Sequence, residues 1–171
     1  DLKPDGNYLF YGDNLDVMQR YIPDNYVDLV YLDPPFKSNQ DYNVLFEEKD
    51  GSQSAAQILA FEDTWHWDRE SRSTFDAMTA AEQLNRGGLH TQIAKTLLGL
   101  RSFLGTNDMM AYITMMAPRL LELRRVMKPT ASIYLHCDDS AAAYLQILLS
   151  VVFGQENFKN QIVWQRTNAH N

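Results

Sequence analysis

Cysteine is nearly absent from this chain of 171 residues, in which Cys137 stands alone. A single thiol excludes a disulfide within the chain, which is typical of proteins in a reducing compartment. No apolar run approaches the roughly 20 residues that a membrane-spanning helix needs, and no stretch resembles a signal peptide. We therefore expect a cytoplasmic protein with no membrane partner.

Positive charge is scarce as well. Lysine and arginine number 15 against 22 aspartate and glutamate residues, which gives a net charge of −7. Because affinity for the phosphate backbone depends on clustered cations, this composition argues against strong nucleic-acid binding by this chain alone. The apolar fraction of 45% is that of a globular protein, and the length suits one domain better than two.

One stretch dominates the sequence: the apolar run of residues 27–32, which stops at Asp33, Pro34, Pro35 and Phe36. Its β-branched and aromatic residues predict a parallel strand buried on both faces. Each proline holds the preceding residue in extended geometry. The turn therefore fixes a carboxylate, a carbonyl oxygen and a ring at the carboxyl end of a strand, where open α/β sheets bind ligands. An acidic turn without a function is the alternative.

A strand and a helix are expected before this strand. Residues 8–11 predict a short strand, and residues 15–21 predict a short amphipathic helix. Asp13 or Asn14 would cap the helix, and capping explains Asp13 as well as a functional role does. Strand, helix and strand in this order form a βαβ unit, which predicts an α/β fold.

After Phe36 the periodicity is lost, so we interpret residues 37–70 as a long, mobile loop insertion near the proposed active site. Residues 61–67 are dense in aromatic rings, among them Trp65. Such rings can stack on nucleic-acid bases or anchor the loop to the core, and the sequence leaves both interpretations open.

The rest of the chain alternates helical and strand patterns. Helices are expected over residues 71–85, 89–104, 109–127 and 141–153, with a kink at Pro118, and strands over 131–136 and 161–166. Residues 128–130 predict a turn into the first of these strands. The cations near the end of the third helix favour a solvated basic face over a nucleic-acid patch: Arg119, Arg124, Arg125 and Lys128.

His136 and Cys137 suggest a metal site at first sight, because Asp138 and Asp139 follow them directly. Adjacent strand residues point to opposite faces, however, so the imidazole and the thiol cannot readily bind one ion. We expect no metal site here, and we interpret Asp138, Asp139 or Ser140 as a helix cap.

These motifs together resemble the DNA methylase N-4/N-6 family, the S-adenosylmethionine-dependent enzymes that methylate exocyclic amino groups of DNA. The order of motifs is similar to that of the permuted, beta-type group, in which the catalytic motif precedes the cofactor loop. The matches are Asp33-Pro34-Pro35-Phe36, Gly12-Asp13-Asn14-Leu15, Asp41-Tyr42-Asn43, Phe61-Glu62-Asp63-Thr64-Trp65, Tyr134-Leu135-His136-Cys137-Asp138, Asn160-Gln161-Ile162-Val163-Trp164 and Arg166-Thr167-Asn168.

The resemblance implies a Rossmann-like methyltransferase sheet with helices on both faces, and S-adenosylmethionine as the cofactor. It implies catalytic roles for Asp33, Pro34, Pro35 and Phe36. Cofactor contacts are implied for Asp13, Asn14 and Asp33. Contacts to double-stranded DNA are expected from Phe36, Lys37, Asn39, Tyr42 and Trp65.

The glycine-rich cofactor loop of the family, Phe-x-Gly-x-Gly, is absent from the sequence, and no two glycines form a Gly-x-Gly. We therefore expect residues 1–171 to be the catalytic-motif half of a methyltransferase domain. It would have an incomplete sheet and be inactive until completed by its C-terminal half or a complementing chain.

The function that the resemblance implies is methylation of adenine amino groups in DNA by a bacterial or phage enzyme of a restriction-modification or orphan modification system. Cytosine amino groups, RNA adenine or protein amides are alternative substrates. A fragment or interaction module without enzymatic activity is the alternative of another class.

Overall fold

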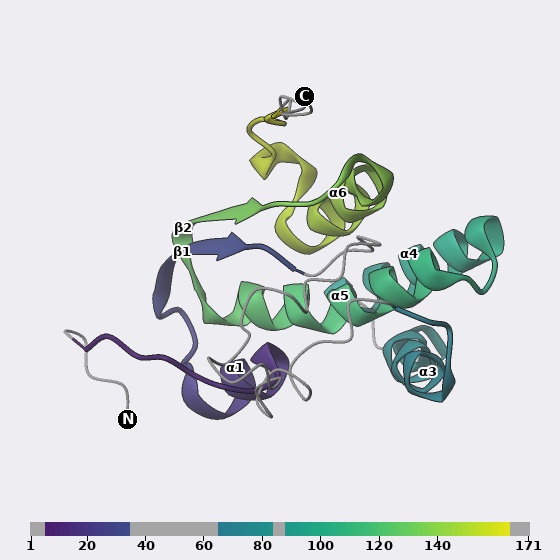
Figure 1. Ribbon diagram of the computed structural model, residues 1–171, viewed down its shortest axis with the longest axis horizontal. Coiled ribbons are helices and arrows are strands. Elements are labelled where there is room, and N and C mark those ends of the chain that lie inside the picture. Colours follow the sequence, from purple (N-terminus) through teal and green to yellow (C-terminus); the bar gives the residue numbers. More distant parts are fainter. Residues whose placement is uncertain (1–5, 35–64, 84–87, 165–171) are drawn as a thin grey trace, which may run out of the picture.

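The computed structural model describes residues 6–34, 65–83 and 88–164 of the chain. Helices and strands mix along the described ranges, which confirms the α/β composition expected from the sequence (Figure 1). In chain order the elements are α1 Asn14–Tyr21, β1 Val27–Leu32, α3 Arg69–Gln83, α4 Gly88–Leu104, α5 Asp108–Val126, β2 Met127–Leu135, α6 Asp139–Phe153 and the 3-10 helix η2 Gln155–Asn157.

Local capping explains where the helices begin. Asp13 caps α1, Asn107 caps α5 and Asp138 caps α6, each by accepting a hydrogen bond from a backbone N–H in the first turn. Gly154 ends α6 with φ of 92°, a left-handed conformation that favours glycine. The four helices predicted from periodicity between residues 71 and 153 are confirmed, with boundaries shifted by a few residues.

The two strands form a parallel sheet in which Val30 lies opposite Ile133 and Leu32 opposite Leu135. The register is irregular between Val27 and Leu29, where β2 carries extra residues. The predicted turn at residues 128–130 is therefore wrong, because these residues lie within β2. Pro129 has no N–H for the ladder, which suits an irregular stretch of strand.

Helix α5 is the centre of the core. Ten of its residues are buried, from Met110 to Val126, and it contacts α1, α3, α4, α6 and β2. Leu120, Ile113 and Ala117 are fully enclosed. Two methionines of this helix, Met110 and Met116, are buried in the core, and Met109 and Met115 pack against it.

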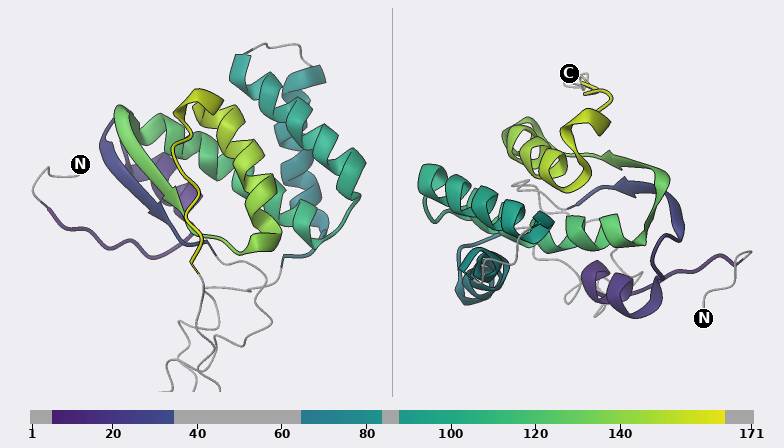
Figure 2. Two further views of the ribbon diagram at one scale, coloured as in Figure 1. Left: turned by 90° about the horizontal axis from the view of Figure 1, so that it is seen from above. Right: turned by 180° about the vertical axis from the view of Figure 1, so that it is seen from behind.

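The described helices cover one face of the sheet. In the left view of Figure 2, α5 and α6 lie to the right of the two strands, and no helix of the described chain lies on their left side. Val30 faces the helices and is 9% exposed, whereas Leu29 and Tyr31 are 60% and 65% exposed. The prediction that β1 is buried on both faces is therefore wrong for the described chain, because nothing in it covers the second face.

Two further strand predictions are not met. Residues 8–11 form no strand, and neither do residues 161–164, whose Ile162, Val163 and Trp164 are 77–83% exposed. Strand composition is not sufficient, because a strand also needs a partner for its backbone. Most of the predicted 37–70 insertion lies outside the described residues, and its end, from Arg69, already belongs to α3.

Candidate active site at the carboxyl ends of the strands

The two parallel strands end side by side. The backbone N–H of His136 donates to the carbonyl oxygen of Leu32 over 2.8 Å, so Asp33 and His136 follow paired residues. Asp33 is exposed and Pro34 is half-buried at this edge. Among the other predicted site residues Pro35, Phe36, Lys37, Asn39 and Tyr42 lie outside the described residues. The position of Asp33 at a carboxyl edge is the one that the Asp-Pro-Pro-Phe motif predicts.

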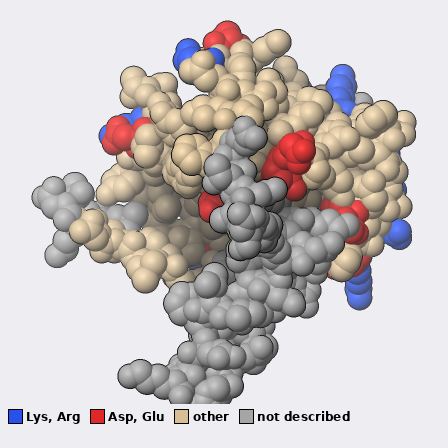
Figure 3. Space-filling view, turned by 45° about the horizontal axis from the view of Figure 1, so that its top comes forward, with Lys and Arg blue, Asp and Glu red and all other residues tan. Residues whose placement is uncertain are grey.

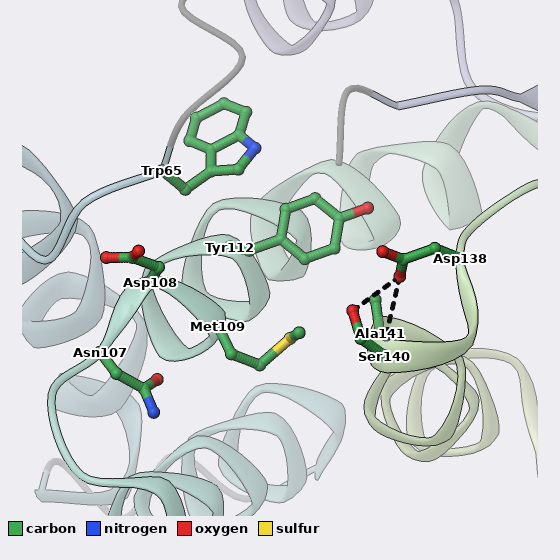
Figure 4. A pocket seen from close by; sticks show the side chains of 8 residues that line it. All are labelled: Trp65, Asn107, Asp108, Met109, Tyr112, Asp138, Ser140 and Ala141. Carbon is green, nitrogen blue, oxygen red and sulfur yellow. Dashed lines mark hydrogen bonds between the residues drawn. The ribbon is translucent and has the colours of Figure 1, made fainter. Parts of the chain in front are cut away.

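A pocket of about 340 Å³ lies near this edge, between the N-termini of α5 and α6 (Figure 4). Its walls combine aromatic and acidic side chains, which suits a planar ligand with hydrogen-bond donors. The lining residues are Trp65, Asn107, Asp108, Met109, Tyr112, Asp138, Ser140 and Ala141.

Tyr112 and Asp138 face each other in this pocket. One carboxylate oxygen of Asp138, Oδ1, accepts from the Ala141 N–H at 3.0 Å and from Ser140 Oγ at 2.9 Å. Its other oxygen points toward the Tyr112 hydroxyl in Figure 4. Tyr112 is 3% exposed, and its hydroxyl has no hydrogen-bond partner in the described part of the chain. Burial raises the pKa of this phenol, and the charges of Cys137 and Asp138 raise it further.

The sequence did not identify Tyr112 as a site residue, since it lies within the apolar stripe of α5. Its position one turn after the Asn107 cap is the signal that could have placed it near a helix N-terminus. The predicted cap at Asp138 is confirmed, and the cap uses only one of the two carboxylate oxygens.

Trp65 packs on the core and also lines the pocket. Its ring lies 6.2 Å from the ring of Tyr112, at an interplanar angle of 39°. The anchoring interpretation of the aromatic residues 61–67 is therefore confirmed for Trp65. Trp67 is an anchor as well: its ring meets the edge of Phe75, and the guanidinium of Arg101 lies over both rings.

Asp13 caps α1 and also binds a cation from α5. Its Oδ1 accepts from the Leu15 N–H at 2.7 Å, and its Oδ2 accepts from Arg119 Nη2 at 2.6 Å. Arg119 also donates to Asn14 Oδ1 over 2.9 Å. Burial lowers the pKa of the Arg119 guanidinium, and the Asp13 carboxylate opposes that effect.

The predicted solvated basic face near the end of α5 is met only in part: Arg124 is exposed, whereas Arg119, Arg125 and Lys128 are half-buried and contact other elements. Arg124 donates to the carbonyl oxygen of Val152, Arg125 donates to the end of α1, and Lys128 pairs with Asp28 on β1 at 2.7 Å. Arg125 also pairs with Glu122 of its own helix at 2.7 Å, but the contacts to Val152, Met18 and Asp28 join residues far apart in sequence, which helical spacing does not reveal.

The electrostatic surface matches the charge balance of the sequence. On the face in Figure 3, lysine and arginine side chains lie apart from one another near the margins, whereas acidic side chains lie both at the margins and nearer the centre. In the described part of the chain no group of three or more His, Cys, Asp or Glu side chains is placed to hold a metal ion. Burial raises the pKa of the Cys137 thiol, and Asp138 raises it further.

Comparison with known protein families gives the class of protein. The chain belongs to the N-6/N-4 DNA methylase family, whose sequence profile matches residues 27–171. Within the described ranges, no helix is long and apolar enough to cross a bilayer.

The curated relatives are subunits of restriction-modification enzymes. The chain is 28% identical over 164 residues to the Mod subunit of the type III restriction-modification enzyme StyLTI of Salmonella typhimurium. It is 24% identical over 166 residues to the EcoP15I Mod subunit of Escherichia coli, and 27% identical over 155 residues to the EcoPI Mod subunit of Escherichia phage P1. These alignments cover 89–95% of this chain but only 20–21% of each relative. No solved structure matches the chain.

Proposed function

We propose that the chain carries the catalytic motif of a DNA methyltransferase that transfers a methyl group from S-adenosylmethionine to the amino group of adenine in double-stranded DNA. The observation that carries the proposal is the position of Asp33 and Pro34 at the carboxyl ends of two parallel strands, in a chain of the DNA methylase family. The relatives suggest a modification component of a restriction-modification system.

Asp33 and Pro34 suit the chemistry of an amino group. The lone pair of an adenine amino group is delocalised into the ring, so the nitrogen is a poor nucleophile. The Asp33 carboxylate and the Pro34 carbonyl oxygen would accept hydrogen bonds from the two N–H groups. They would thereby favour a pyramidal nitrogen and stabilise the positive charge that develops on it. Asp33 is exposed and can meet such a substrate.

The target base has to leave the duplex to reach these acceptors, at a cost of a few kcal/mol. Stacking on an aromatic ring contributes about 1–3 kcal/mol per base, so Phe36 would offset much of that cost. Lys37, Asn39, Tyr42 and Trp65 are the further DNA contacts of the proposal. Trp65 lines the pocket next to the strand ends, which supports its inclusion.

Asp13 and Asn14 fit a role in holding the cofactor, together with Asp33. The Asp13 carboxylate is 53% exposed and can accept hydrogen bonds from the hydroxyl or amino groups of a nucleoside. S-adenosylmethionine supplies an electrophilic methyl group on its sulfonium. The glycine-rich part of its site would come from outside these 171 residues, in a C-terminal half of the polypeptide or in a complementing chain.

We further propose that the sheet belongs to a larger Rossmann-like sheet with helices on both faces. The exposed apolar side chains on the open face of β1 and β2 support this: Leu29, Tyr31 and Tyr134 are 50–65% exposed. Large apolar side chains gathered on one sheet face favour burial against another layer.

The test is replacement of Asp33 in the complete polypeptide that carries this chain. Asp33→Ala should abolish methyl transfer to DNA while the far-UV circular dichroism spectrum and the melting temperature stay unchanged, because Asp33 is exposed. Asp16→Ala, which alters an exposed carboxylate on α1, is the matched control and should retain activity. Retained turnover in the Asp33→Ala protein would refute the catalytic assignment.

A further inference from the structure

Arg119 reaches from the middle of α5 to the N-terminus of α1. Its guanidinium donates to Asp13 Oδ2 at 2.6 Å, to Asn14 Oδ1 at 2.9 Å and to the carbonyl oxygen of Met115 at 2.9 Å. The Arg119 side chain is 16% exposed, whereas that of Asp13 is 53% exposed. A nearly buried cation therefore holds two polar side chains that are open to solvent.

Folding of α1 does not require this arrangement. The helix cap uses Asp13 Oδ1, which accepts from the Leu15 N–H, so Oδ2 is not needed for capping. Asn14 is the first residue of α1, and its side chain makes no contribution to the capping bond. The contacts from Arg119 instead hold the second carboxylate oxygen of Asp13 and fix the Asn14 side chain, which would otherwise move among several rotamers in solvent.

The rigid fork of arginine suits this task. The planar guanidinium presents its N–H groups in a fixed geometry, so one side chain can hold two acceptors at once, which an ammonium group does less well. A ligand that meets side chains already fixed in place loses less conformational entropy on binding. Helices α1 and α5 contact each other (Figure 1), which brings Arg119 of α5 to the N-terminus of α1.

We propose that Arg119 is a positioning residue for the cofactor, which presets Asp13 and Asn14 to contact the nucleoside of S-adenosylmethionine. The inference rests on the proposed function, because that function assigns the two residues to the cofactor. Arg119 acts through them and does not touch the reacting atoms.

The experiment compares Arg119→Met, Arg119→Lys and Arg20→Met in the complete polypeptide. Arg20→Met is the matched control, because Arg20 also pairs with an aspartate of α1, Asp16, but at an exposed position. Titration calorimetry with S-adenosylmethionine gives Kd, and steady-state methylation of DNA gives KM for the cofactor and kcat. Circular dichroism verifies that each variant is folded.

We expect Arg119→Met to raise Kd and KM for S-adenosylmethionine about tenfold or more, with little change in kcat at saturating cofactor, because the methyl-accepting site is untouched. Arg119→Lys keeps the charge but loses the planar guanidinium, so the increase in Kd and KM should be smaller than that of Arg119→Met. Arg20→Met should leave both constants within about twofold. If Arg119→Met does not fold, the proposal is tested with Arg119→Lys, whose Kd and KM for S-adenosylmethionine should still exceed those of Arg20→Met.

A double-mutant cycle with Asp13→Asn locates the effect. Asparagine caps helices as well as aspartate does, so this change removes the ion pair without removing the cap. If Arg119 acts through Asp13, Arg119→Met weakens cofactor binding less in the Asp13→Asn background than alone. The proposal would be overturned if the effects of Arg119→Met and Asp13→Asn on cofactor binding were fully additive, or if Arg119→Met bound the cofactor as the unaltered protein does. The proposed function would stand in either case. No cofactor binding by the unaltered protein would instead refute the proposed function.

Discussion

The guanidinium of Arg125 binds the carbonyl oxygen of Ile22, the residue that ends α1. Both terminal nitrogens lie 3.2 Å from this oxygen, and Nη2 also donates to the carbonyl oxygen of Met18 at 2.8 Å. Carbonyl groups at a helix C-terminus lack partners within the helix, and a cation there also favours the helix dipole. Arg125 therefore joins the end of α1 to the end of α5.

Loss of this contact should destabilise the protein. Hydrogen bonds to charged groups contribute roughly 1.5–3 kcal/mol, so Arg125→Met should lower the free energy of unfolding by about 2 kcal/mol. Arg125→Lys should lose less, because a single ammonium still reaches one carbonyl. Urea unfolding of the complete polypeptide measures the effect, with Arg20→Met as an exposed control. Equal stability of Arg125→Met and the control would mean that the contact contributes nothing.

Tyr112 gives a prediction for alkaline pH. Burial, Cys137 and Asp138 raise the pKa of its phenol above the ordinary value of 10.0. A raised pKa in the folded state stabilises the fold below the unfolded value, and that contribution is lost as the pH rises above about 10. The free energy of unfolding of the unaltered protein should therefore fall relative to that of Tyr112→Phe between pH 9 and pH 11.

At neutral pH Tyr112→Phe should be at least as stable as the unaltered protein, because it removes a buried hydroxyl that has no partner within the described ranges. Tyr21→Phe, on the exposed side of α1, is the control and should follow the unaltered protein at every pH. Parallel pH profiles for all three proteins would contradict the burial of a neutral phenol.

The open face of the sheet gives a third prediction. If a further layer covers Leu29 in the complete polypeptide, Leu29→Ala should cost about 2–5 kcal/mol of unfolding free energy, as buried leucines do. Phe103, on α4, is 77% exposed and serves as the control, for which Phe103→Ala should change stability by no more than about 0.5 kcal/mol. A Leu29→Ala effect as small as that of the control would indicate that this face is open to solvent in the complete protein as well.

The features of the fold that could be predicted from the sequence depend on residues close to them in the chain. The helix starts follow from caps within the first turn, such as Asp13 and Asp138, and β1 follows from an apolar run that stops at prolines. These signals lie within a few residues of the feature that they determine, so a single sequence suffices to read them.

Long-range relationships could not be predicted in the same way. Arg119 meets Asp13, which is 106 positions away in sequence, and Arg125 meets Ile22, which is 103 positions away, so helical spacing does not reveal these contacts. The exposure of Tyr31 depends on what covers the sheet, and residues 161–164 lack a strand despite their composition. The residues of the pocket come together through the packing of α5 against α6 and of Trp65 against Tyr112.

The most direct test of the account identifies the methylated atom. DNA is incubated with the complete polypeptide and S-adenosylmethionine that carries a deuterated methyl group, then digested to nucleosides and analysed by mass spectrometry. We predict labelled N6-methyladenine from the unaltered protein and none from the Asp33→Ala protein. Label in N4-methylcytosine alone, or no labelled nucleoside at all from a folded polypeptide that binds the cofactor, would contradict the account.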